Sequence, residues 1–174
     1  MGNIRQFLYF KKLRFDAKSH ASKPRDMINL FKADRIGILF DASSADDIIT
    51  VSKYAESLSR LGKQVSILAY QNNKDKDKDD ARFFNKLNVN WFYIPKSDKI
   101  VAFHKKNFDI LICAFIDESL PLEYIVATSD AKFRVGAFSD AKTNYYELMI
   151  NTQKNQSIKY LLDQINHFLK VINP

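Results

Sequence analysis

Residues 35–70 decide the fold, and they read RIGILFDASSADDIITVSKYAESLSRLGKQVSILAY. The stretch opens on an almost continuous apolar run at residues 35–41, which is typical of a strand buried on both faces. Apolar side chains then recur at helical spacing over residues 48–61, and Gly62 ends this predicted helix. A second apolar run follows at residues 65–70. The order strand, helix, strand predicts two parallel strands joined by a right-handed crossover.

The alternation of strands and helices continues along the rest of the chain. Further strands are predicted at residues 89–94, 108–115, 133–138 and, at an edge, 145–150, and further helices at about residues 81–87, 98–106, 120–129 and 156–172. Trp91 and Tyr93 are expected to be half-buried in the first of these strands. We therefore expect one Rossmann-like α/β domain at residues 26–174, with a mostly parallel open sheet of five or six strands flanked by helices.

Composition and cysteine usage exclude several classes of protein. The 174 residues are 46% hydrophobic and 27% charged, which suits a single domain with a real core and excludes a wholly disordered chain. The one cysteine, Cys113, lies in a predicted apolar strand, so we expect an inert core thiol and no internal disulfide. No apolar run reaches the roughly 18 residues that a transmembrane helix needs. Because the pattern of a cleaved signal peptide is also missing, we expect a cytoplasmic location.

Basic charge is concentrated in the first 25 residues. The whole chain has a formal net charge of +7, whereas residues 1–25 hold seven basic side chains and one acidic one, a net +6, which leaves +1 for residues 26–174. The seven basic side chains are Arg5, Lys11, Lys12, Arg14, Lys18, Lys23 and Arg25. Four aromatic residues lie among them: Phe7, Tyr9, Phe10 and Phe15. The apolar spacing predicts an amphipathic helix from about residue 3 to residue 17, with a short linker at residues 20–24.

Three interpretations of this basic N-terminal arm stay open. It can be a helix docked on its own domain with solvated cations. It can bind nucleic acid, because Lys and Arg neutralise phosphates and aromatic rings stack on unpaired bases. It can also dock on an anionic membrane surface or on a protein. Our leading hypothesis is a non-catalytic protein that docks on structured RNA, such as the ribosome, with its seven basic side chains on phosphates. Phe7, Tyr9 and Phe10 would stack on bases or pack against a protein neighbour.

A second candidate site lies in the loops that follow two predicted strands. In sheets of this class, ligands bind at the carboxyl ends of the strands. The crevice there would be lined by Asp41, Ser43, Ser44 and Asp117. The serines, at a helix N-terminus, could hold a phosphate, and the carboxylates could act as acid and base or bind a cation. The loop has no glycine, however, so neither the dinucleotide fingerprint nor the P-loop is present, and Asp46 and Asp47 would repel an anion.

We expect no metal site and no cofactor. The three histidines, His20, His104 and His167, have no second ligand at helical spacing. The run QNNKDKDKDD at residues 71–80 lacks the central glycine and terminal glutamate of a calcium loop. Its alternating charges indicate a solvated loop.

Residues 108–136 carry a family resemblance. They read FDILICAFIDESLPLEYIVATSDAKFRVG, in which Phe108-Asp109 opens a strand, and Ala131-Lys132 with Arg134-Val135-Gly136 forms the next. This segment resembles part of the first Rossmann-like domain of heptosyltransferase-like glycosyltransferases. The resemblance implies a nucleotide-binding type of sheet, and hence an alternative function as a small nucleotide- or nucleotide-sugar-binding protein that uses the crevice. Those enzymes need a second domain for the sugar nucleotide, for which this chain has no room. The whole chain also resembles a family of small proteins of the Bacteroidota, which implies no activity.

Overall fold

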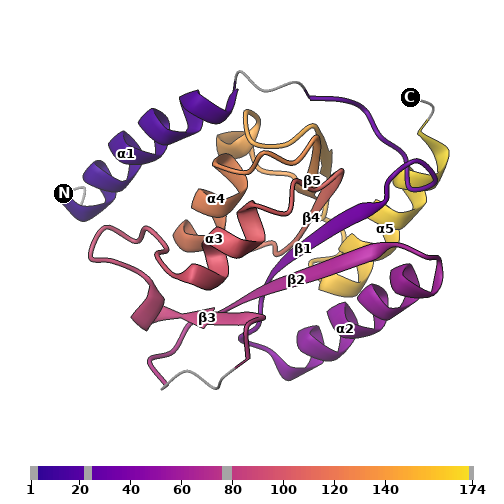
Figure 1. Ribbon diagram of the computed structural model, residues 1–174, viewed down its shortest axis with the longest axis horizontal. Helices are drawn as coiled ribbons and strands as arrows, with labels where there is room; N and C mark the ends of the chain where they lie inside the picture. The colour runs from indigo at the N-terminus through magenta and orange to yellow at the C-terminus, as the bar shows by residue number, and fades with distance from the viewer. Residues whose placement is uncertain (1–3, 22–24, 76–79, 173–174) are drawn as a thin grey trace.

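Six parallel strands form one open sheet (Figure 1). The computed structural model describes residues 4–21, 25–75 and 80–172. In these ranges the sheet has the order β3-β2-β1-β4-β5-β6, and every neighbouring pair is parallel. The strands are β1 (Arg35–Asp41), β2 (Gln64–Gln71), β3 (Phe83–Asn85), β4 (Ile110–Ala114), β5 (Phe133–Ala137) and β6 (Leu148–Ile150). The predicted α/β fold is confirmed, and the sheet is parallel throughout rather than mostly parallel.

The unit β1–α2–β2 forms as its sequence predicts. Residues 36–40 of β1 are all buried, because the strand is covered on both faces. Helix α2 (Ala45–Arg60) begins after Ser44, whose hydroxyl accepts a hydrogen bond from the Asp47 N–H at 3.4 Å. The chain leaves α2 through Gly62, whose φ of +80° costs a glycine little.

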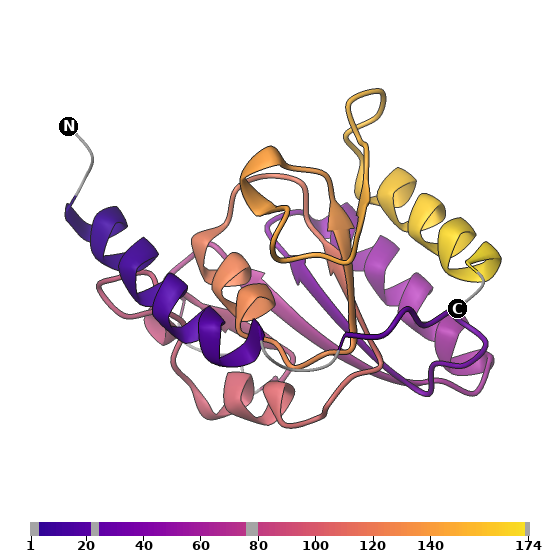
Figure 2. The same ribbon diagram turned by 90° about the horizontal axis from the view of Figure 1, so that it is seen from above.

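Helices cover both faces of the sheet (Figures 1 and 2). On one face α2 and α5 (Ile158–Val171) share an apolar core with β1, β4 and β5. On the other face α3 (Asp98–His104) and α4 (Leu120–Ala127) enclose a second core. Helix α1 (Ile4–Ala21) adds a further layer outside α4, as Figure 2 shows. It ends later than predicted, and residues 22–24 of the predicted linker lie outside the described residues.

The segment between β2 and α3 corrects two predictions. A helix was expected at residues 81–87, but the chain there forms the short edge strand β3 and a 3-10 turn at Lys86–Asn88. A strand was expected at residues 89–94, but these residues form a loop closed by one bridge between Val89 and Pro95. Aromatic and β-branched side chains are common at residues 89–94, and such residues favour a strand, which is why the prediction was wrong.

Asn90 explains why this segment is a loop. Its side-chain oxygen accepts hydrogen bonds from the N–H groups of Phe92 at 2.9 Å and Ile94 at 3.0 Å. These backbone groups are therefore satisfied locally rather than by a neighbouring strand. Tyr93 takes a positive φ of 61° in the turn. Trp91, predicted to be half-buried, is 56% exposed as a result.

The strand order determines where the sheet opens to a ligand. β1 lies at the centre, and the chain continues to β2 on one side and later to β4 on the other. The loops that follow β1 and β4 therefore diverge at the carboxyl edge. In open α/β sheets, ligands bind at this reversal of strand order.

Candidate functional site

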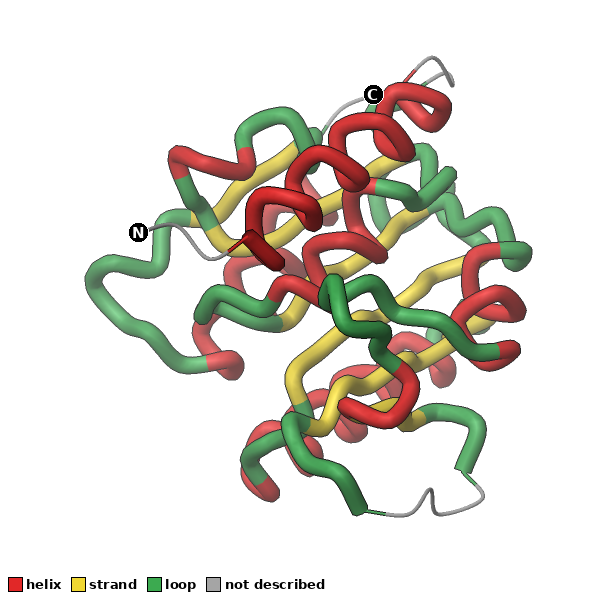
Figure 3. Tube along the Cα trace, turned by 90° about the vertical axis from the view of Figure 1, so that its left-hand side faces the viewer, coloured by secondary structure: helices red, strands yellow, loops and turns green. Residues whose placement is uncertain are grey.

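The inner face of α1 fastens this helix to the rest of the protein. Tyr9 and Leu13 are 0% and 1% exposed, and they pack with Ile94 and Ala127. The Tyr9 Oη donates a hydrogen bond to the Leu120 carbonyl at 2.7 Å. In Figure 3, which is viewed from the side of α1, the helix lies across the outside of the molecule. The basic N-terminal arm is thus a docked helix, and one of its faces points outward.

The one carboxylate of α1 is turned away from that outward face. Asp16 accepts hydrogen bonds from Tyr124 Oη at 2.5 Å and from Lys12 Nζ at 2.7 Å. Burial, together with the adjacent Asp16 carboxylate, raises the pKa of Tyr124. One turn later, His20 Nδ1 lies 2.6 Å from Asp130 Oδ1. These contacts place the acidic charge of α1 against α4 and leave the opposite side to cations and rings.

The outward side of α1 combines aromatic rings with cations. We call it the outer face, and it consists of Phe7, Phe10, Lys11, Arg14, Phe15 and Lys18, which together line a shallow groove of about 580 Å³. All six residues are exposed, and Phe15 reaches 73%. Lys11, Arg14 and Lys18 form no ion pair with any residue that the structure describes. The outer face can therefore offer charge and stacking surface to the same partner.

Two of the arginines predicted to contact RNA form hydrogen bonds within the protein instead. Arg5 Nε donates to the Trp91 carbonyl at 2.8 Å, and its guanidinium lies 4.3 Å from the centroid of the Tyr93 ring. Arg25 donates to three backbone carbonyls, those of His20, Ser129 and Ala131. Burial lowers the pKa of Arg25, and the neighbouring Arg134 lowers it further.

The other predicted contacts also divide between the two sides of α1. Tyr9 lies in the core, where its ring cannot meet a base while α1 is docked. Lys12 is half-exposed and paired with Asp16. Lys23 lies outside the described residues. The structure thus brings together Lys11, Arg14, Lys18, Phe7 and Phe10 out of the predicted set, and adds Phe15 to them.

The predicted crevice exists at the carboxyl edge of the sheet. Its four residues, Asp41, Ser43, Ser44 and Asp117, line one pocket of about 490 Å³. Asp41 Oδ1 accepts hydrogen bonds from both the N–H and the Oγ of Ser43, and Ser44 caps α2. Burial raises the pKa of Asp47 at the start of α2, and the hydrogen bond with the Ser44 side chain opposes this only in part. The side chains of this crevice therefore already form the turn that begins α2.

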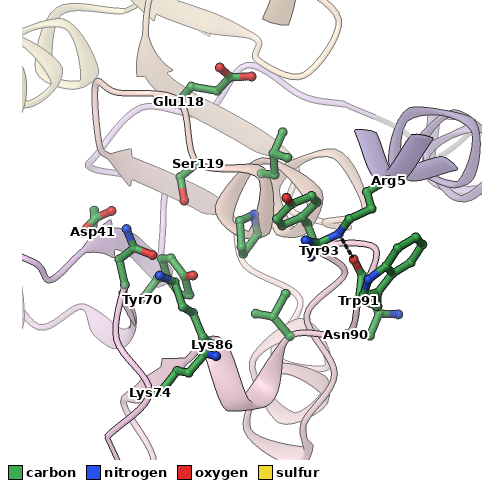
Figure 4. Close-up of a pocket in the computed structure, with 14 residues that line it drawn as sticks. Arg5, Asp41, Tyr70, Lys74, Lys86, Asn90, Trp91, Tyr93, Glu118 and Ser119 are labelled. Atoms are coloured by element: carbon green, nitrogen blue, oxygen red, sulfur yellow. Dashed lines mark hydrogen bonds between the residues drawn. The ribbon is translucent and has the colours of Figure 1, made fainter. Parts of the chain in front are cut away.

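A larger pocket opens beside the crevice at the same edge (Figure 4). We call it the strand-end pocket. It has a volume of about 530 Å³ and lies at the ends of β1, β2, β3 and β4. Its chemically distinctive lining consists of the cations Arg5, Lys74 and Lys86, the rings of Tyr70, Trp91 and Tyr93, and the hydroxyl of Ser119. Sequence reasoning missed this pocket because it placed Trp91 and Tyr93 in a strand. The signal that it could have used is the cluster of aromatic residues beside Lys86.

The residues that carry the glycosyltransferase resemblance have structural roles. Asp109 accepts hydrogen bonds from the N–H groups of Asp34 and Arg35 and from Lys132 Nζ at 2.9 to 3.0 Å. These bonds outweigh the effect of burial and lower the pKa of Asp109. Arg134 forms an ion pair with Glu147 at 2.8 Å. The motif therefore ties β1, β4, β5 and β6 together, away from the carboxyl edge.

The described residues contain neither a cluster of metal ligands nor a helix that could span a membrane. Within residues 4–21, 25–75 and 80–172, no three His, Cys, Asp or Glu side chains gather as ligands for a metal ion. None of the helices in these ranges combines the length and apolar character needed to cross a bilayer. Cys113 is buried, as expected.

Comparison with known proteins gives one match. No curated protein and no solved structure matches the chain significantly. A family model described as a family of unknown function (DUF6913) matches residues 5–172. The match includes α1 and the whole sheet, so the docked helix is part of what the family model describes. The chain therefore belongs to the DUF6913 family, whose function is unknown.

Proposed function

We propose that this protein docks on structured RNA, such as that of a ribosomal particle, through the outer face of α1. The observation that carries the proposal is the composition of that face. Three cations and three phenylalanines share it, and the single carboxylate of the helix is held on the opposite side by Tyr124. Such a face is complementary to a polyanion that also presents unpaired bases.

The charge on the outer face provides the affinity. Lys11, Arg14 and Lys18 have no competing ion pair among the described residues, so binding a phosphate does not require an ion pair to break. Each phosphate that is neutralised releases counterions. With three such contacts, the logarithm of the binding constant should fall by about 2 to 3 for each tenfold rise in salt concentration.

The docked state of α1 lowers the cost of binding. Tyr9 and Leu13 hold the helix in place before any partner arrives. The outer face is therefore presented on a preformed helix, and less conformational freedom is lost on association. Arg5, Tyr9 and Arg25 are left out of the proposed interface because their side chains hold α1 and its continuation on the domain.

The decisive experiment compares two charge-reversal variants of the full chain. The outer-face variant is K11E/R14E/K18E. The control, K53E/K154E/K170E, changes exposed lysines away from α1, and both variants lower the formal charge from +7 to +1. We expect the outer-face variant to lose RNA binding at low salt and the control to lose far less. Equal losses would show that net charge alone attracts RNA, and unchanged binding of the outer-face variant would refute the proposal.

The rings of the outer face are tested separately. Base stacking on an aromatic side chain contributes about 1–3 kcal/mol, so F7A/F15A should weaken binding to single-stranded segments at least fivefold. Its fold should stay intact, because both rings are largely exposed. Flotation with liposomes of graded anionic lipid content distinguishes a membrane surface from RNA. Binding to vesicles without binding to RNA would show that the partner is a membrane surface and would refute the proposal.

A further inference from the structure

The strand-end pocket has the size and the location of a small-molecule site. Its volume of about 530 Å³ lies within the range of roughly 300–1,000 Å³ that such sites occupy. It lies at the carboxyl edge of the sheet, where it is lined by Asp41 at the end of β1 and by the segments that follow β2, β3 and β4. This is where open α/β sheets bind their ligands.

Ser119 gives the pocket its most specific feature. This residue immediately precedes α4 and is only 9% exposed, yet its Oγ has no hydrogen-bond partner among the residues that the structure describes. Buried hydroxyls without a partner are uncommon, because burial deprives them of water. In Figure 4 the Ser119 hydroxyl points from the start of α4 toward Asp41 and Tyr70, into the pocket. The Oγ is closed to solvent in this structure, so an oxygen of a ligand would satisfy it once the side chain rotates further toward the pocket.

The cations that line the pocket favour an anionic oxygen, whereas the Ser119 N–H itself donates to the buried Glu123 carboxylate at 3.1 Å. The positive end of the α4 dipole lies at this residue. Lys74 and Lys86 line the pocket, and neither forms an ion pair with another described residue. Of the two carboxylates in the lining, Asp41 is bonded to Ser43, and Glu118 points away from the centre of the pocket (Figure 4).

Aromatic rings line the other end of the pocket. Trp91 and Tyr93 lie there with Arg5, whose guanidinium is 5.1 Å from the Trp91 ring and 4.3 Å from the Tyr93 ring. The Asn90 side chain fixes the loop that carries both rings, and Tyr93 keeps a positive φ within it. A non-glycine residue is held in this conformation only where its surroundings require it. The result is a rigid surface on which a planar group can stack.

We infer that the strand-end pocket binds a nucleoside phosphate. The phosphate lies at Ser119 and the start of α4, within reach of Lys74 and Lys86, and the base packs against Trp91 and Tyr93. The hydroxyl and cations at one end and the rings at the other match the two halves of a nucleotide. The site is separate from the outer face of α1, so the inference does not depend on the proposed docking to RNA.

Ligand binding to the full chain tests the inference. Calorimetry and thermal unfolding would be measured with AMP, ADP, GDP, UDP and inorganic pyrophosphate. At least one nucleotide should bind and raise the Tm. S119A should weaken that nucleotide about tenfold, because a hydrogen bond to a charged group is lost. The Tm of the free S119A protein should stay the same or rise slightly, because the hydroxyl has no partner to lose.

Matched variants separate this site from general charge effects. K86E should abolish nucleotide binding, whereas K53E on α2 and the outer-face variant K11E/R14E/K18E should leave it unchanged. W91A should weaken nucleotides but not pyrophosphate. Three outcomes would overturn the inference: no nucleotide binds, S119A binds as tightly as the native chain, or pyrophosphate binds as tightly as every nucleotide.

Discussion

At the scale of single residues, close packing on the sheet leaves no space at Gly136. A Cβ placed there would lie 2.6 Å from Cε1 of Tyr146 and 3.2 Å from the Cβ of Cys113. The Tyr146 ring is itself buried, so it has little room to move. We therefore expect Gly136→Ala to lower the free energy of unfolding by about 1–3 kcal/mol, measured by urea denaturation.

A double-mutant cycle shows whether the Tyr146 ring causes that loss. Tyr146→Leu removes the ring atoms nearest to Gly136, so the effect of Gly136→Ala should shrink in its presence. Gly62 provides a contrast, because nothing lies within 4 Å of an added Cβ and only its φ of +80° resists substitution. Strictly additive effects of the Gly136 and Tyr146 changes would contradict the packing argument.

At the scale of the helix, α1 should behave as part of the fold rather than as a detachable arm. Leu13 and Phe15 are two residues apart in α1, but Leu13 is buried and Phe15 projects outward. Leu13→Ala should therefore lower the free energy of unfolding by about 2–4 kcal/mol, because it leaves a cavity against α4. Phe15→Ala should change it by less than about 0.5 kcal/mol. Equal effects in chemical denaturation would mean that α1 is not docked in solution.

The stability of α1 also limits how its function can be tested. Deleting residues 1–25 would expose Ile94, Ala127 and the apolar side chains around them. Loss of RNA binding after such a deletion could then result from unfolding. Point variants of the outer face avoid this, since the side chains that they change are exposed.

The elements that the sequence predicted are those with strong local signals. β1 and β4 are continuous apolar runs, and α2 has a cap at Ser44 and a stop at Gly62. β3 has only three residues and exists because it pairs with the end of β2, a contact that no local pattern encodes. The loop at residues 89–95 was misassigned because one side chain, that of Asn90, outweighs the propensity of its neighbours.

The candidate sites also contain features that the sequence predicts and features that depend on the tertiary structure. The charge of α1 is visible in the sequence, but which side chains point outward depends on the packing of Tyr9 and Leu13 against α4. The clustering of Asp41 and Asp117 follows from parallel strands ending at one edge. The unpartnered hydroxyl of Ser119 could not be predicted, because it depends on what does not surround it in three dimensions.

At the scale of the whole molecule, His104 should make stability depend on pH. Burial, and then the neighbouring His20, lower the pKa of His104 from 6.5 to about 4, and its Nε2 has no partner among the described residues. Between pH 4 and 6.5 the unfolded chain therefore binds the proton better than the folded protein. Stability is at its full value above pH 6.5 and falls as the pH decreases through this window.

The contribution of His104 to the pH dependence of stability can be measured by comparison with His167, an exposed histidine. From pH 7 to pH 4.5 we expect His104 to account for a loss of about 2–3 kcal/mol in the free energy of unfolding. His104→Gln should flatten the dependence over that range, whereas His167→Gln, at an exposed position on α5, should retain it. A native chain whose stability does not change between pH 7 and 4.5 would rule out the burial of a neutral imidazole.

The hydrogen bond between Tyr9 and Leu120 has a consequence for biosynthesis. Its two ends are separated by 111 positions in the chain. At 5–20 residues per second, a ribosome needs roughly 5 to 20 s to synthesise that distance. Throughout this interval α1 has been made but the surface that receives it has not. The first helix to be translated is thus among the last to pack, and the order in which the layers assemble runs against the order in which they are synthesised.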